Sequence, residues 1–276
     1  MSRRRLVTAG WMRWALVLAA VAFALVAMPG AAFGQTDEIQ VYNAEIENPG
    51  AWNLMIHTNF TPIGRTQPVF PGSIIANDSV NGTAEWAYGV TPWFEQGFYL
   101  PVYSLHSTNR GATINGFKIR ELFVRPHADK HKFFYGMNFE FSVNRDYWED
   151  RTITSEIRPI IGVHLGPWDL IYNPIMDTDY TGGLGGLQYN PAGRIAYNVN
   201  DQWAVAYEEY DGFGTFSEIL PLQQQFHESW AVMDYTSHKF VDVEAGVGVG
   251  TTTGSDRLTF KLMLSRDLNC PITRCP

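Results

Sequence analysis

The sequence predicts an all-β protein, an antiparallel transmembrane β-barrel of about 12 strands that follows an N-terminal signal peptide. Apolar and polar residues alternate with a period of two through most of the chain after Gln35, and no long segment has helical periodicity. Short and long links between the expected strands follow one another in turn. Aromatic residues lie near the strand ends, where a membrane barrel carries its girdles.

Residues 1–34 predict a cleaved secretory signal. Four arginines lie at or before position 13, and the uncharged run "WALVLAAVAFALVAM" follows them. The small residues of "AAFGQ" suit cleavage before Gln35, and the apolar run is shorter than the roughly 20 residues of a membrane helix. We expect a barrel domain at 35–268 and a tail at 269–276. Loss of four arginines changes the net charge from −8 to −12, which argues against nucleic acid as a partner.

The expected strands are short runs with alternating hydrophobicity, each bounded by turn residues. They lie at 51–61, 82–90, 94–104, 113–126, 133–144, 154–165, 168–177, 187–199, 203–211, 228–236, 239–250 and 256–268. Pro159 and Pro174 fall within two of them, where each removes a hydrogen-bond donor from the ladder.

The links between these strands sort by length. Strands two and three are joined by "TPW" and strands six and seven by "GP", whereas the first link is "PIGRTQPVFPGSIIANDSVNG". Outer-membrane barrels have short periplasmic turns and longer outer loops. An even number of strands then places both ends of the barrel on the periplasmic side. A soluble sandwich offers no reason for this sorting.

The run "FFYGMNFEFSVN" at 133–144 shows the two rows of a strand. Phe133, Tyr135 and their apolar successors form one row, and the other carries Glu140. Alternation alone also fits a soluble barrel or sandwich. The link lengths and the aromatic strand ends favour an apolar row that faces lipid, with Glu140 in the lumen. Glu121 and Glu209 fall on the apolar row of their strands, so we expect them near an interface or a bulge.

The polar rows supply the candidate functional residues. The lumen and selectivity residues are predicted to be Lys118, Arg120, Glu140, Glu156, Arg158, His164, Arg194, Glu208, Asp242, Glu244, Arg257 and Lys261. They either form a structural salt-bridge network that fills the lumen or a charged constriction that selects what passes. The glycines of "GVGVG" are expected to make room for bulky neighbours such as Arg158 or Tyr210.

The sequence predicts neither an enzyme nor a metal or cofactor site. Outer-membrane phospholipases use a Ser and a His on the outer face, and no apolar row carries that pair. Asp177 and Asp179, with His164 or His227, are the nearest match to a pair of catalytic acids, but acidic loops are more often solvated. His127 and His131 are assigned to a solvated turn. Pairing of Cys270 with Cys275 is left open.

Three stretches resemble a known family: "EWAYGVTPWFEQGFYLPVYS", "SEIRPIIGVHLGPWDLIYNPIMDTDY" and "SDRLTFKLMLSRDL". They are similar to a family of proteobacterial outer-membrane β-barrel proteins related to the transporters grouped under the MetA pathway of phenol degradation. The resemblance implies an outer-membrane location in a Gram-negative bacterium and uptake of small organic compounds. It implies no catalytic residues. Many outer-membrane barrels end on an aromatic residue, and "NCPITRCP" departs from that pattern.

The sequence therefore predicts a passive, porin-like channel or transporter for small solutes with a narrow charged lumen. The alternative is a closed structural or binding barrel that acts through its outer loops and does not conduct. The expected partners are outer-membrane lipid and small-molecule solutes, with no nucleic acid. The oligomeric state is left open.

Overall fold

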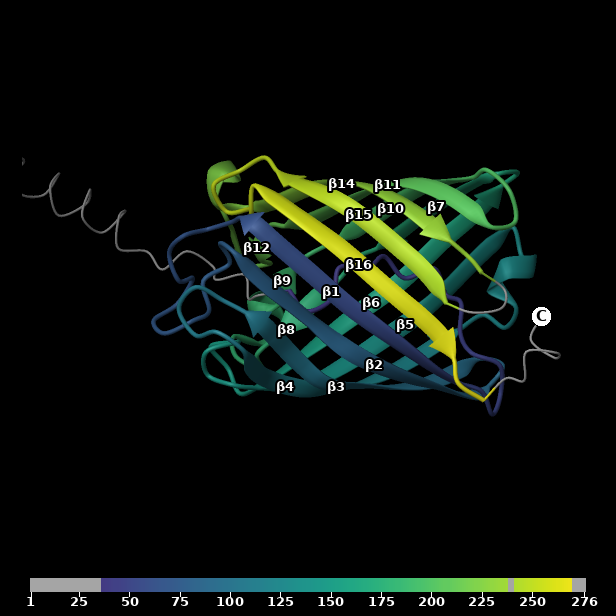
Figure 1. The fold of residues 1–276 in the computed structure, drawn as a ribbon, viewed down its shortest axis with the longest axis horizontal. Coiled ribbons are helices and arrows are strands. Elements are labelled where there is room, and N and C mark those ends of the chain that lie inside the picture. The colour runs from purple at the N-terminus through teal and green to yellow at the C-terminus, as the bar shows by residue number, and fades with distance from the viewer. Residues whose placement is uncertain (1–35, 238–240, 270–276) are drawn as a thin grey trace, which may run out of the picture. The chain divides into compact units, whose positions relative to one another are not determined.

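Twelve strands of the described chain close into an antiparallel barrel, as the sequence predicts (Figure 1). The computed structural model describes residues 36–237 and 241–269. The predicted signal peptide, Cys270 and Cys275 lie outside these ranges. The wall strands are β1 (Trp52–Ile63), β2 (Ser79–Thr91), β3 (Phe94–His106), β4 (Thr113–Val124), β5 (Phe133–Asn144), β6 (Ile153–Leu165), β7 (Trp168–Asn173), β10 (Ala192–Asn198), β11 (Trp203–Gly212), β14 (Phe226–Tyr235), β15 (Asp242–Gly250) and β16 (Leu258–Asp267).

Each wall strand is hydrogen-bonded to the next, and β1 pairs with β16 to close the ring. Four short strands extend the wall beyond β6: β8 (Met176–Thr178), β9 (Gln188–Tyr189), β12 (Gly214–Thr215) and β13 (Glu218–Ile219). Three 3₁₀ turns lie in the links: η1 (Ala128–Lys130), η2 (Gly183–Gly186) and η3 (Leu222–Gln224). The described residues contain no helix that is long and apolar enough to cross a membrane.

Proline explains where two expected strands are interrupted. The expected strand 168–177 is divided into β7 and β8, with Pro174 in the gap, and 187–199 is divided into β9 and β10, with Pro191 in the gap. Proline has no N–H to donate to a ladder. Pro159 remains inside β6, opposite Met137 of β5. The register of β5 with β6 is continuous through Pro159, so this proline does not divide its strand.

The two ends of the barrel differ in their links. Two residues join β2 to β3 and β6 to β7, whereas the links after β1, β5 and β11 include the longer ones. We call these the short-turn end and the long-loop end. The barrel begins and finishes at the short-turn end, where the N–H of Leu268 donates to the carbonyl of Trp52 at 2.7 Å. This agrees with the expected even strand number.

The apolar rows face outward. In β5 the Phe133 and Tyr135 side chains are about half exposed, whereas Phe134 and Glu140 are buried inside the barrel. Phe139 of β5 contacts Phe123 of β4 on the outer face, and Phe123 stacks with Trp93 from the turn between β2 and β3. An outward surface of this composition suits lipid rather than water. The expected outward position of the apolar row and inward position of Glu140 in the "FFYGMNFEFSVN" strand are therefore confirmed.

The glycines of β15 make room for large inward side chains, but not for the two that were expected. A Cβ on Gly248 would lie 2.1 Å from Cε2 of Trp230, and one on Gly246 would lie 3.1 Å from Cε of Lys261. The Trp230 ring is buried and lies across the backbone of Gly248. The side chains that need this space are therefore Trp230 of β14 and Lys261 of β16, and not Arg158 or Tyr210.

Gly248→Ala should lower the stability of the barrel by about 1–3 kcal/mol, because the added methyl overlaps the Trp230 ring and forces it from its place. Urea unfolding in detergent micelles measures the change. Gly193→Ala is the matched control, since a Cβ there would meet its nearest atom at 3.8 Å. Equal effects of the two substitutions would show that backbone freedom, and not space for Trp230, explains the glycine.

Candidate functional site

A stretch of chain ahead of β1 runs inside the barrel. We call residues 36–47 the luminal segment. Near its start, the Asn59 side chain of β1 donates to the carbonyl of Asp37 at 3.1 Å. At its other end, the N–H of Glu47 donates to the Glu95 carboxylate at 2.6 Å. The segment therefore occupies the lumen from the level of Asn59 to the short-turn end.

Two cationic side chains from different wall strands hold the first half of the luminal segment. Lys118 of β4 forms an ion pair with Asp37 at 2.9 Å. Arg158 of β6 donates to the carbonyl of Gln40 at 3.1 Å and lies 3.5 Å from the Glu38 carboxylate. These wall residues were predicted to line the lumen, either as a salt-bridge network that fills it or as a charged constriction, and in the structure they bind the luminal segment.

Tyr42 is the central contact of the segment. Its backbone exchanges two hydrogen bonds with the Asn173 side chain, at 2.7 and 3.1 Å. Its hydroxyl lies 2.6 Å from the Tyr99 hydroxyl, and the Arg158 guanidinium lies 4.2 Å from its ring centroid. A buried tyrosine with a satisfied hydroxyl and a cation over its ring is a firm anchor.

Buried charges around Tyr42 are paired, as burial requires. Lys118 lies 3.5 Å from Glu140, which also accepts a hydrogen bond from Asn138 at 3.0 Å. Arg158 forms a two-point contact with Glu156 within its own strand, at 2.6 and 2.9 Å. Lys118 is thus the cation beside Glu140.

Arg120 connects three further side chains on the adjacent wall. Its guanidinium contacts Glu85 at 2.6 Å and forms a short ion pair with Glu95. Glu85 also lies 2.9 Å from Nε2 of His57. All four groups are buried. Together with the Lys118 and Arg158 contacts, they form one continuous network that we call the first cluster.

A second cluster lies on the opposite part of the wall. Lys261 contacts Glu208 at 2.5 Å and Glu244 at 2.6 Å. Arg194 forms a short ion pair with Glu208 and lies 3.5 Å from Glu244. Lys261 also donates to the carbonyl of Ile39 at 3.1 Å. The luminal segment is therefore bound from β16 as well as from β4 and β6.

Part of the inward face of the wall is apolar, which was not predicted from the sequence. Leu122, Phe134 and Ile160 project inward and pack against Val41 and Ala44 of the luminal segment. Burying this surface favours the docked segment, at roughly 25 cal/mol for each Å² removed from water. The lumen is therefore amphipathic, with an apolar strip between charged clusters.

A cavity of about 530 Å³ remains between the luminal segment and the wall. It opens among residues of the short-turn end, such as Asn200 and Trp203. Arg120 and Arg194 contribute its guanidinium groups, and carboxylates outnumber them. The acidic lining residues are Glu45, Glu47, Glu85, Glu95, Asp169, Asp201, Asp234, Asp242, Glu244 and Asp267.

The two clusters contain most of the predicted lumen residues. These are Lys118, Arg120, Glu140, Glu156 and Arg158 in the first, and Arg194, Glu208, Glu244 and Lys261 in the second. His164 pairs with Asp169 at 2.5 Å, and Asp242 is exposed at the cavity rim. Arg257 differs from the expectation: β16 begins at Leu258, and Arg257 is exposed at the long-loop end.

The residues that fill the lumen were not predicted from the sequence. Asp37, Glu38 and Tyr42 precede the first strand and have no strand-like alternation with a wall partner. A signal did exist: two adjacent acids and a tyrosine lie directly ahead of a barrel whose polar rows carry lysines and arginines that can bind them. His57 was missed because it looks like an ordinary member of a strand. Tyr99 was expected among the aromatic residues of the outer girdle, and this was wrong: its side chain is buried inside the barrel against Tyr42.

The two candidate catalytic acids have separate partners. Asn190 donates to Asp177 at 2.6 Å, and Arg151 lies 3.3 Å from Asp179. Burial raises the pKa of the neighbouring Glu149 to about 7, and the two aspartates add to that effect. Asp177 lies on the short strand β8 and Asp179 follows it, so the two carboxylates bind different neighbours at the long-loop end.

The outer face does carry a serine and a histidine, contrary to the expectation. Ser229 and His227 both lie on the outward row of β14. Ser229 donates to Glu209 at 2.6 Å, whereas Nδ1 of His227 faces Asp211 at 2.5 Å. The hydroxyl is thus bonded to a carboxylate and not to the imidazole, so the pair lacks the nucleophile–base contact of a hydrolase.

No protein-family model and no curated protein matches the sequence. Among solved structures, the chain is similar to the COG4313 outer membrane channel from Pseudomonas putida F1, with a TM-score of 0.55 and 13% identity over 84% of this chain and 100% of that one. It is also similar to the KdgM porin, with a TM-score of 0.51 and 10% identity over 79% and 99%. A structure of KdgM porin in complex with disordered oligogalacturonate has a TM-score of 0.50 and 9% identity over the same shares. The chain therefore has the closed β-barrel fold of outer-membrane channels.

Proposed function

We propose that the protein is an outer-membrane channel through which small solutes pass passively, along the gap between the luminal segment and the wall. The observation that carries the proposal is the 530 Å³ cavity inside a barrel of this fold. The cavity is larger than a single small solute and lies on the only axis that a barrel offers for passage. The luminal segment then sets the width of the path.

The charge of the cavity favours cations and neutral solutes over anions. Its carboxylates outnumber the guanidinium groups of Arg120 and Arg194. Rings of acidic side chains select cations in channels, because the low dielectric of the wall strengthens their field. Oligogalacturonate, the ligand named for the KdgM complex, is a polyanion, so we do not extend that substrate to this chain.

Small organic compounds are the solute class that we propose. The resemblance to transporters of the MetA pathway supports this class, and so does the apolar strip of Leu122, Phe134 and Ile160 beside the charged clusters. An amphipathic lumen can accept a solute with an apolar body and a polar tip. The outer-membrane location belongs to the same proposal.

Single-channel recording in a planar bilayer with a KCl gradient tests the channel. We expect a small conductance and a reversal potential on the cation-selective side. Neutralising two exposed cavity residues, Asp201→Asn with Asp242→Asn, should reduce the cation preference. Asp146→Asn, in the link between β5 and β6 at the other end, is the matched control and should leave it unchanged. An anion-selective wild-type channel would contradict the proposal.

The second candidate is a closed barrel that acts through its outer loops. The ion pairs and hydrogen bonds that hold the luminal segment favour it, since they link the segment to β4, β6 and β16. Absence of current from a protein with normal heat-modifiable migration would favour this candidate and exclude the channel.

A further inference from the structure

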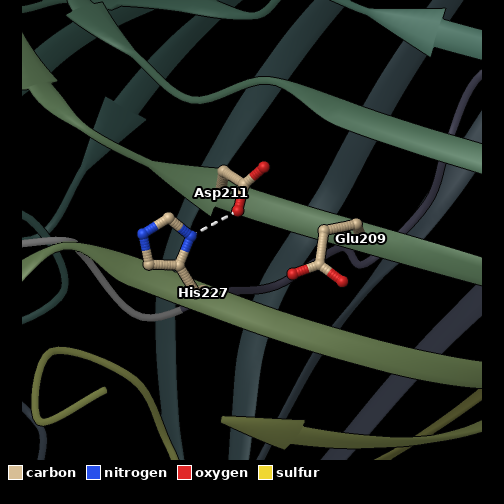
Figure 2. A group of neighbouring side chains, drawn as sticks. All are labelled: Glu209, Asp211 and His227. Carbon is tan, nitrogen blue, oxygen red and sulfur yellow. Dashed lines mark hydrogen bonds and ion pairs between the residues drawn. The ribbon is translucent and has the colours of Figure 1, made fainter. Parts of the chain in front are cut away.

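Two neighbouring strands carry a polar group on the outside of the barrel. Glu209 and Asp211 lie on the outward row of β11, and His227 lies on the outward row of β14, opposite Asp211 in the register. The three side chains turn toward one another (Figure 2). One ligand atom from each lies within 4.8 Å of the other two. These residues are separate from the luminal clusters and are not used by the proposed channel.

The orientation of the His227 ring is set by a residue outside this group. The Gln225 side chain donates its amide N–H to the carbonyl of Leu220 at 2.7 Å, which leaves its oxygen toward His227. That oxygen, Oε1, lies 2.9 Å from Nε2 of the ring. A carbonyl oxygen only accepts, so Nε2 carries a hydrogen. Gln225 is itself more than nine-tenths buried, which fixes this arrangement.

Neutral His227 therefore has its lone pair on Nδ1, and Nδ1 lies 2.5 Å from Oδ1 of Asp211. A lone pair that faces a carboxylate oxygen at this distance is repulsive unless a cation lies between them. At 2.5 Å a proton fits between the two atoms, and a metal ion with bonds of about 2.0–2.2 Å fits once they have moved apart. Metal-bound histidines commonly donate their other N–H to a carbonyl or carboxylate oxygen, and Gln225 supplies that contact here.

Glu209 favours a divalent metal over a proton. Ser229 and Tyr207 both donate to its Oε2, which leaves Oε1 for a cation. A proton on His227 would leave the group of two carboxylates and one imidazole with a net charge of −1. A divalent ion brings the net charge to zero, which suits an outward face with aromatic neighbours such as Phe213.

We propose that Glu209, Asp211 and His227 bind a divalent transition-metal ion of the zinc class. One nitrogen and two carboxylate oxygens form a ligand set that zinc accepts, with bonds of about 2.0–2.2 Å and a fourth position left open. Tetrahedral bonds of that length require donor atoms roughly 3.3 Å apart. Binding therefore requires Nδ1 of His227 and Oδ1 of Asp211 to move apart from their present 2.5 Å. The ion joins β11 to β14, and Gln225 acts as a positioning residue from the link before β14.

Metal titration of the full chain in detergent, after treatment with EDTA, tests the site. Isothermal titration with Zn²⁺ should show one equivalent bound, and Co²⁺ should give visible absorption bands of a low-coordinate site. His227→Gln and Glu209→Gln should abolish or strongly weaken both signals. Gln225→Ala should weaken binding about 10–100-fold, the usual effect of losing a partner that orients a ligand.

His164→Gln is the matched control. His164 faces Asp169 at the same 2.5 Å through Nδ1, and His164 and Asp169 are not part of the three-ligand group. This variant should keep Zn²⁺ affinity. Heat-modifiable migration of every variant confirms that the barrel has formed. Zn²⁺ binding that is absent from the wild type, or equal in wild type and His227→Gln, would overturn the metal site, whatever the channel recordings show.

Discussion

Deleting residues 38–45 should raise the single-channel conductance several-fold. The deletion removes the backbone that Arg158 and Lys261 bind, together with the Tyr42 anchor. Water then occupies the released space, and a barrel of about 12 strands is wide enough to conduct when its lumen is empty. Cation preference should also fall, because the deletion removes Glu38, the acidic partner of Arg158 in the segment. Planar bilayer recording measures both changes.

The wall strands pair with one another independently of the luminal segment, so the shortened chain is expected to form a barrel. Tyr42→Phe is the control: it removes one hydroxyl and keeps the segment, and its conductance should match the wild type. If the deletion variant shows normal heat-modifiable migration and an unchanged conductance, the segment does not limit flow.

Lys261→Ala should destabilise the barrel by about 3–5 kcal/mol. Lys261 is completely buried between Glu208 and Glu244, and its loss leaves two carboxylates to share the Arg194 guanidinium. Removing one partner of a buried ion pair has a cost of this size, because the remaining carboxylates lose their closest cation and gain no hydration in its place. Reversible urea unfolding in lipid vesicles measures the free energy.

Two further variants separate pairing from loss of packing. Arg257→Ala removes an exposed cation and should change stability by less than about 0.5 kcal/mol. The double variant Lys261→Ala with Glu208→Ala should lose less than the sum of its single changes, because the two groups interact directly. If Lys261→Ala is as mild as Arg257→Ala, water in the lumen solvates the carboxylates.

The wall of the barrel could be predicted because its pattern is local. Phe133–Asn144 has the predicted bounds, since strict alternation along 12 residues and turn residues on both sides define that strand. The inward position of Glu140 followed from the same parity. The strand breaks at Pro174 and Pro191 could not be predicted, because the sequence does not show which hydrogen-bond ladder each proline interrupts. The expected strands therefore ran through both prolines. Strand β14 also alternates weakly, and this concealed the outward His227.

The contents of the lumen could not be predicted in this way. The luminal segment has no regular secondary structure, and its contacts join residues far apart in the sequence: Lys118 and Asp37 are separated by 81 positions. Residue identity alone told us that Lys118, Arg158 and Lys261 needed acids or carbonyls nearby. It did not show that some of these acceptors come from the chain ahead of β1.

The seam between β1 and β16 constrains the order of assembly. Its strands are the first and last of the wall, so their pairing closes the longest loop in the chain and is expected to come late in folding. The last strand also contacts the luminal segment, because Lys261 on β16 donates to the carbonyl of Ile39. The segment is thus positioned to act as an internal template. In the closed barrel Lys261 lies opposite Asn59 of β1, which binds the carbonyl of Asp37, so both strands of the seam contact the segment at the same level.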